Sequence, residues 1–167
     1  ALEDVNLPVV FSKANSDTYG SVINRELQNH VDTHAETWLV DNLGLATYAN
    51  LMNHALAMVG NSSSGIIEAP YFGLPVVNIG NRQKGRIRAE NVIDVGYDRS
   101  QIVTGINKAT AVTFKETIKQ AKNPYGDGKA AEIILVIIKR YLQSENLIHK
   151  RFNDLNVTSS DSLSVGS

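Results

Sequence analysis

The sequence of 167 residues contains no cysteine. This absence excludes disulfide frameworks, thiolate zinc sites and cysteine nucleophiles, and it suits a reducing compartment. The sequence also lacks any apolar run near the ~20 residues that a membrane-spanning helix needs. Its first residues carry acids where a signal peptide carries bases. We therefore expect a cytoplasmic protein with no membrane partner.

An excess of charge of either sign is missing as well. The 16 Lys and Arg residues nearly balance the 17 Asp and Glu residues, and the formal net charge is -1. Such a chain supplies no broad field for a polyanion, so nucleic acid is not expected as a partner. Hydrophobic residues, by contrast, make up 43% of the sequence. The chain is therefore able to bury a core, and its length is that of one domain.

Short β-branched runs alternate with longer amphipathic stretches, which is typical of an α/β domain with a mostly parallel sheet. The pattern predicts a sheet of about five strands at 7–11, 37–40, 56–59, 76–79 and 92–95, with helices at 17–31, 46–54, 101–109 and 114–121. A final helix from Ala130 to Tyr141 has its apolar residues on one stripe, so we expect it to pack on an apolar surface. The domain is expected to cover 1–155, followed by a disordered polar tail at 156–167.

A serine-rich turn, GNSSSGIIE from Gly60 to Glu68, follows one predicted strand and opens a helix. Ligands of open parallel sheets bind at the carboxyl ends of the strands, where a helix N-terminus offers free N–H groups to an anion. Three hydroxyls could add donors to phosphate oxygens, and the glycine that follows them lets the backbone approach closely. The alternative is a serine N-cap on an ordinary helix, and spacing alone does not separate the two.

Further polar residues are expected at the same edge of the sheet. Glu68 lies one turn beyond the serines, where it accepts hydrogen bonds from a ribose diol or simply favours the start of a helix. The run from Asn81 to Arg88 holds four cations, which form either a phosphate clamp or a solvated face. Asn15 follows the first strand, although asparagine is also a routine turn residue.

No catalytic residue, metal site or cofactor is predicted from these patterns. The four histidines, His30, His34, His54 and His149, have no metal-ligand spacing, and no pair of acids suggests an acid/base couple. The residues alone therefore predict a nucleotide- or phosphate-binding α/β domain without obvious catalytic groups.

Two motifs resemble those of a known family. The run GNSSSGIIEAPYFGLPVVNIGNRQKGRIRAENVI from Gly60 to Ile93 resembles the signature of the UDP-N-acetylglucosamine 2-epimerase family. Within it, VNIGNRQKGR is similar to the hydrolysing branch of that family. A second motif, NPYGDGKAAEII from Asn123 to Ile134, matches too, and the resemblance covers nearly the whole chain up to the tail.

The resemblance implies a fold like that of the two-domain GT-B glycosyltransferases, with this chain as the Rossmann-like C-terminal half. A start at Ala1 instead of Met also suggests a fragment whose N-terminal domain is missing. The family's UDP-binding positions correspond to Asn15, Ser62, Ser63, Glu68 and Arg82, and Ser64 and Gly65 complete the predicted UDP site.

The implied reaction is hydrolytic epimerisation: UDP leaves UDP-N-acetylglucosamine by elimination, and water adds to give N-acetylmannosamine. This isomerase and hydrolase chemistry would feed amino sugar metabolism for sialic-acid-type or surface-polysaccharide sugars. The family's acid/base residues lie in the N-terminal half, so we expect this chain alone to be inactive, and a homodimer is expected only of the intact protein. Two alternatives remain: the C-terminal domain of a GT-B glycosyltransferase, and a non-catalytic module that binds UDP-sugars.

Overall fold

The computed structural model describes residues 1–14, 19–119 and 121–142. These residues belong to two compact units, Ala1–Asp127 and the part of the chain from Gly128 onward. The predicted polar tail at 156–167 lies outside the described residues, so its disorder stays a prediction.

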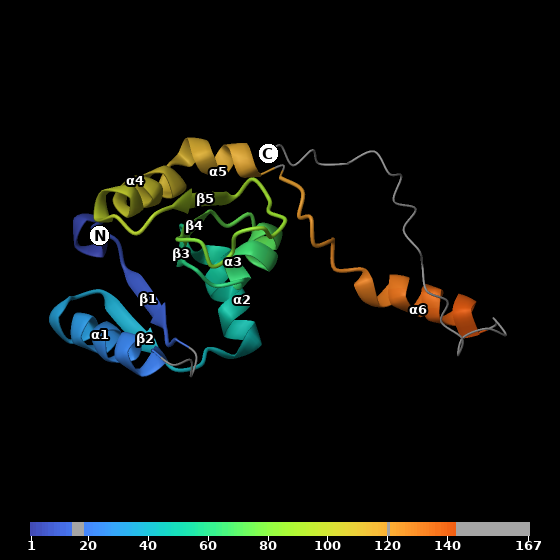
Figure 1. Cartoon of the computed structure of the whole chain (residues 1–167), viewed down its shortest axis with the longest axis horizontal. Coiled ribbons are helices and arrows are strands. Elements are labelled where there is room, and N and C mark those ends of the chain that lie inside the picture. The colour runs from blue at the N-terminus through green and yellow to red at the C-terminus, as the bar shows by residue number, and fades with distance from the viewer. Residues whose placement is uncertain (15–18, 120, 143–167) are drawn as a thin grey trace, which may run out of the picture. The chain divides into compact units, whose positions relative to one another are not determined.

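Strands and helices alternate through the first unit, as the sequence pattern predicts (Figure 1). Paired strands run parallel throughout the described ranges. The strands lie within about two residues of their predicted positions, and the α/β class is confirmed. The elements in chain order are η1 (Leu2–Asp4), β1 (Val9–Ser12), α1 (Gly20–Thr33), β2 (Thr37–Val40), α2 (Gly44–His54), β3 (Met58–Gly60), α3 (Ser64–Ile67), η2 (Ala69–Phe72), β4 (Val76–Ile79), β5 (Val92–Val95), α4 (Arg99–Thr110) and α5 (Val112–Ile118).

The expectation of one sheet of about five strands is wrong for the described residues. β1 pairs with β2 in a two-stranded sheet, and β3, β4 and β5 form a separate three-stranded sheet in that order. No hydrogen-bonded ladder joins β1 to β3 in these ranges. The two sheets are therefore separate. Local hydrophobic pattern identifies a strand but not its neighbour, which is why the sequence did not show this division.

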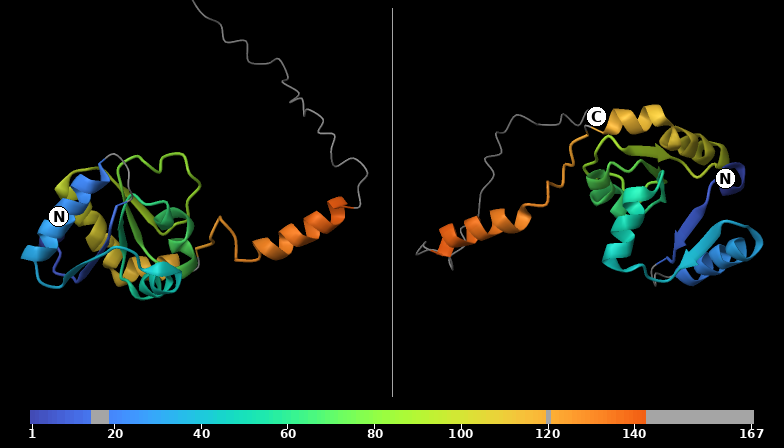
Figure 2. Two further views of the ribbon diagram at one scale, coloured as in Figure 1. Left: turned by 90° about the horizontal axis from the view of Figure 1, so that it is seen from below. Right: turned by 180° about the vertical axis from the view of Figure 1, so that it is seen from behind.

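The core of the first unit lies on the two faces of β4, and helices cover both (Figures 1 and 2). Val76 packs with Met52 of α2 on one face, whereas Val77 packs with Ile106 of α4 on the other. Each such side chain contributes roughly 1.5–3 kcal/mol when fully buried. Successive residues of a strand point to opposite faces, and both faces of β4 are covered. The run Val76–Ile79 is therefore apolar throughout, apart from one asparagine.

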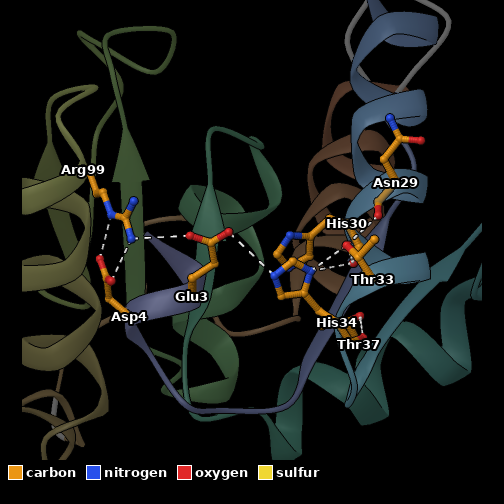
Figure 3. Close-up of polar contacts among 8 residues, drawn as sticks. All are labelled: Glu3, Asp4, Asn29, His30, Thr33, His34, Thr37 and Arg99. Atoms are coloured by element: carbon orange, nitrogen blue, oxygen red, sulfur yellow. Dashed lines mark hydrogen bonds and ion pairs between the residues drawn. The ribbon is translucent and has the colours of Figure 1, made fainter.

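A polar anchor holds the start of the chain to α4 (Figure 3). The Arg99 guanidinium donates to both carboxylate oxygens of Asp4, at 2.7 and 2.8 Å. This contact holds the pKa of Asp4 below its ordinary value of 3.8 and raises the pKa of Arg99. Glu3 lies between Arg99 and His34, with nitrogen to oxygen distances of 3.4 and 3.6 Å. Residues 1–5 are thereby positioned just ahead of β1.

The described part of the second unit contains α6 (Ala130–Leu142). The predicted helix is confirmed, and its packing on an apolar surface stays a prediction. In the ranges that the structure describes, no helix combines the length and the apolar character that crossing a membrane requires.

Candidate functional site

The serine-rich turn connects β3 to α3, as predicted. Ser62 and Ser63 are exposed, whereas Ser64 is half-buried. Ser63 occupies the N-cap position of α3 but makes no side-chain capping hydrogen bond. The Ser62 Oγ instead accepts the Ser64 N–H at 3.3 Å. The turn therefore leaves two serines, Ser62 and Ser63, exposed.

Two features of the turn differ from what the sequence predicts. α3 extends only from Ser64 to Ile67, so it adds little of the helix dipole that the anion argument invoked. Gly65 is buried, and a Cβ placed there would lie 2.9 Å from Val76 Cγ1. The close approach of α3 to β4 thus accounts for this glycine without a ligand. The predicted anion site therefore rests on hydroxyl donors and nearby cations.

Glu68 lies beside the serines, as its spacing indicates. Its Oε2 accepts a hydrogen bond from the Ser64 hydroxyl, and Ser64 Oγ lies 2.7 Å from the hydroxyl of Tyr48 in α2. Because Ser64 donates to Glu68, Tyr48 is the donor in that second contact. Ser64 therefore links Tyr48 to the exposed carboxylate of Glu68, and its predicted contact with UDP stays a prediction. Tyr48 was not singled out from the sequence, where it appears as one more half-buried position of a helix.

The basic run from Asn81 to Arg88 is tied to the serine-rich turn. Gln83 is only 3% exposed, and its Nε2 donates to the carbonyl of Asn61 at 2.8 Å. Its Oε1 is buried without a hydrogen-bond partner among the described residues. Arg88 in turn donates to the Gln83 carbonyl at 2.8 Å. The turn and the basic run are thus held together at the carboxyl ends of β3 and β4.

The four cations of this run have different roles. Arg88 is half-buried and pairs with Asp94 of β5, so it belongs to the framework. Arg82, Lys84 and Arg86 are exposed on the same loop. Exposure alone does not separate a phosphate clamp from a solvated face for these three cations, so the clamp stays a prediction.

Buried polar residues at the strand ends were missed by the sequence reading. Asn78 of β4 is 1% exposed, and its Nδ2 donates to Asp94 Oδ1 at 2.7 Å. Asp94 consequently links β4, β5 and the basic run through Asn78 and Arg88. The sequence did contain a signal for this contact, because an asparagine stands within a run of aliphatic residues. A buried side-chain amide requires a hydrogen-bond partner.

The second family motif also reaches this region. The Tyr125 hydroxyl donates to the carbonyl of Ile87 at 2.9 Å, and the Asn123 side chain accepts the Tyr125 N–H at 2.9 Å. The turn that contains Tyr125 therefore contacts the basic run, although the two segments are 38 residues apart in the sequence.

The remaining residues singled out from the sequence lie elsewhere or are not described. Asn15 lies outside the described residues. The ring of His30 in α1 stacks on that of His34, which directly follows the helix, with 3.9 Å between the centroids. No group of possible metal ligands occurs in the described ranges. A shallow depression lies between β5 and α4, and neither Ser62 nor Glu68 lines it.

Comparison with known proteins places the chain in a family. Residues 1–139 match the family model described as UDP-N-acetylglucosamine 2-epimerase. The chain belongs to this family. It is 41% identical over 151 residues to a Campylobacter jejuni protein named GDP/UDP-N,N'-diacetylbacillosamine 2-epimerase (hydrolyzing), which covers 90% of this chain and 39% of that protein.

Other members of the UDP-N-acetylglucosamine 2-epimerase family give the same picture. A Legionella pneumophila protein named UDP-N,N'-diacetylbacillosamine 2-epimerase (hydrolyzing) is 37% identical, covering 87% of this chain and 37% of its own length. The polysialic acid biosynthesis protein P7 of Escherichia coli is 33% identical with the same coverages, 87% and 37%.

The fold agrees with a solved family structure. A chain from Listeria monocytogenes named as a UDP-N-acetylglucosamine 2-epimerase has a TM-score of 0.65, with 21% identity over 89% of this chain and 38% of that one. This likeness confirms the predicted fold class, parallel strands flanked by helices as in the GT-B fold. The chain spans about two fifths of the length of these relatives.

Proposed function

We propose that this chain is the UDP-binding part of a hydrolysing UDP-N-acetylglucosamine 2-epimerase. The family match and the hydrolysing relatives support the activity of the longer protein. The single observation that carries the binding role is the hydrogen bond from Gln83 to the Asn61 carbonyl. It holds two exposed hydroxyls and a cationic loop at one edge of a parallel sheet, where nucleotides bind in such folds.

The proposed roles follow from the chemistry of each side chain. The hydroxyls of Ser62 and Ser63 donate to the diphosphate, and Glu68, oriented by Ser64, accepts from the ribose diol. Arg82 lies on the facing loop and stabilises the negative charge of the nucleotide. In an elimination that releases UDP, this charge grows on the leaving group, so the same contacts would lower the barrier.

The proton transfers of the reaction need further groups. Abstraction of a proton beside an amide-bearing carbon requires a positioned acid or base within hydrogen-bond reach of the sugar. We assign no such residue in this chain and place the acid/base groups in the remainder of the longer protein. That remainder is the expected partner, together with the substrate UDP-N-acetylglucosamine. A cytoplasmic location and a homodimer of the intact protein complete the proposal.

Calorimetric titration of the chain with UDP and with uridine tests the binding role. We expect a dissociation constant for UDP in the micromolar to millimolar range, roughly 4 to 8 kcal/mol, and far weaker binding of uridine. The double variant Ser62→Ala, Ser63→Ala should reduce the preference for UDP. Ser21→Ala, which alters an exposed serine of α1, is the matched control and should bind UDP as the unmodified chain does. Equal affinities for UDP and uridine would remove the diphosphate from the proposal.

A further inference from the structure

The basic run between β4 and β5 is folded into two successive turns. The carbonyl of Asn81 accepts the Lys84 N–H at 2.9 Å. The carbonyl of Gln83 accepts the Arg86 N–H at 3.3 Å. Gly85 has a φ of 84°, in the left-handed region that favours glycine, and a Cβ there would meet no atom within 4 Å. The residues from Lys84 to Arg86, which we call the tip, therefore border open space.

Like charges at the tip oppose this folded shape. Lys84 and Arg86 are both exposed, stand two residues apart and carry the same charge. Mutual repulsion and the hydration of each charge favour an open loop in which the two cations separate. An anion can bind both cations at low entropic cost only where other contacts keep the tip folded.

The two sides of the tip are held by different contacts. On one side Gln83 is 3% exposed and bonds the carbonyl of Asn61, so it is fixed by burial. On the other side the Ile87 side chain is 71% exposed, so apolar burial does not hold this part of the run. Its backbone is held by a hydrogen bond, because the Tyr125 hydroxyl donates to the Ile87 carbonyl at 2.9 Å.

Tyr125 reaches Ile87 from a turn of defined conformation. The Asn123 side chain accepts the Tyr125 N–H at 2.9 Å, and the Asn123 carbonyl accepts the Gly126 N–H at 3.2 Å. Pro124 restricts the backbone between them, and Gly126 has a φ of 105°. The phenol ring is 44% exposed, so the backbone of the turn, more than burial of the ring, sets the place of the hydroxyl.

We propose that Tyr125 is a positioning residue for the nucleotide site. Through the carbonyl of Ile87, its hydroxyl keeps the tip in the shape in which Lys84 and Arg86 both face the diphosphate. The inference rests on the proposed function, because it takes the diphosphate beside the serine-rich turn as the ligand. Tyr125 itself touches no ligand. A tip that is ordered before the ligand arrives loses less entropy on binding, so the same cations bind the diphosphate more tightly.

Calorimetric titration of the variant Tyr125→Phe tests this role. We expect the dissociation constants of UDP and of inorganic diphosphate to rise by the same factor, about 3- to 10-fold. The melting temperature should stay within about 2 °C, because the lost contact is exposed. Tyr141→Phe removes a hydroxyl from an exposed tyrosine of α6 and is the matched control. Weakening of UDP alone would place the effect at the nucleoside and contradict the inference.

Limited digestion with trypsin reports on the tip without any ligand. Trypsin cleaves after lysine and arginine, so both cations of the tip are cleavage sites, and cleavage follows the population of the open loop. We expect cleavage after Lys84 and Arg86 to be about 3- to 10-fold faster in Tyr125→Phe. Cleavage after Lys115, an exposed lysine of α5, should be unchanged and is the internal control.

A double-variant comparison shows whether Tyr125 acts through the cations. In a chain that carries Lys84→Gln and Arg86→Gln, the tip has no charge left to position. Tyr125→Phe should therefore have no further effect on the affinity for UDP in that chain, which is the non-additivity expected of coupled residues. A full effect of Tyr125→Phe in the absence of both cations would overturn the inference.

The outcomes separate this inference from the proposed function. If the unmodified chain does not bind UDP, the proposed function is rejected and the inference falls with it. If the chain binds UDP and Tyr125→Phe leaves that affinity unchanged, only the inference is rejected. Equal rates of cleavage at the tip in both chains would also reject it, because the hydroxyl would then not hold the tip.

Discussion

Single buried polar residues hold the candidate site in shape. Asn78 and Gln83 are almost fully buried, and each uses its side-chain amide to hold a neighbouring segment. Gln83 spans 22 residues of sequence to reach the carbonyl of Asn61. A buried amide is costly unless it is bonded, so these contacts restrain the loops that carry the proposed ligand groups.

Replacing Gln83 by methionine should destabilise the chain. The variant keeps the length of the side chain but removes the hydrogen bond to the Asn61 carbonyl, which contributes about 0.5–1.5 kcal/mol. Urea denaturation measures the loss. Gln28→Met is the control, because Gln28 bonds Asp32 on the exposed surface of α1 and its loss should stay within about 0.5 kcal/mol. Equal stability of the two variants would show that the Gln83 contact does not hold the turn.

Replacing Glu68 by glutamine should separate the ribose role from a structural one. If the carboxylate accepts from the ribose diol, loss of its charge removes about 1.5–3 kcal/mol, or roughly 10- to 150-fold in UDP affinity. Inorganic diphosphate has no ribose and should bind the variant as well as it binds the unmodified chain. Glu90→Gln, at another exposed acid, is the control. Equal weakening of both ligands would assign Glu68 a structural role, through its contact with Ser64.

At the scale of the elements, short segments are stabilised by contacts far away in the sequence. η1 has only three residues, yet its Asp4 pairs with Arg99, 95 residues later. α3 has four residues and is stabilised by the packing of Gly65 and Ile66, both of which are buried. Elements of this length are not stable in isolation, because helix nucleation outweighs the few hydrogen bonds that they form.

The contact between Asp4 and Arg99 should make stability depend on pH. The folded pKa of Asp4 is lowered by its hydrogen bonds to Arg99, so the stabilisation is present above pH 3.8 and is lost as the pH falls through the lowered pKa. Asp4→Asn should therefore reduce the melting temperature slightly at pH 7 and not at all at the lowest pH at which the chain stays folded. Glu90→Gln, at an exposed acid outside this anchor, is the comparison. A constant difference between Asp4→Asn and the unmodified chain at every pH would contradict the assignment.

At the scale of the whole molecule, the described residues form one covered sheet and one separate pair of strands. The sheet of β3, β4 and β5 is covered on both faces, whereas β1 and β2 form a separate pair. The family relatives are more than twice as long as this chain. The catalytic reaction therefore belongs to the longer protein in our proposal.

We expect no release of UDP from UDP-N-acetylglucosamine by the 167-residue chain. Each missing acid/base group contributes ~10² to 10⁴ in rate, and a solvent-facing half-site does not align the sugar. The longer protein encoded by the same gene should release UDP and N-acetylmannosamine in equal amounts. Coupled detection of free UDP checks both samples, with heat-treated protein as the blank. Turnover by the short chain at the rate of the longer protein would place the acid/base groups within these residues and contradict the proposal.

The sequence alone determined the local structure and the kinds of residue at the site. Period-two and period-3.6 patterns located the strands and the long helices, and the spacing of Ser64 and Glu68 placed the two residues side by side, because these signals act within one turn or one strand. Only the tertiary structure decided which strands are neighbours, that Arg88 pairs with Asp94, and that Gln83 holds Asn61. Strand order and buried polar contacts join separate segments, and their energies depend on burial and geometry that no local pattern contains.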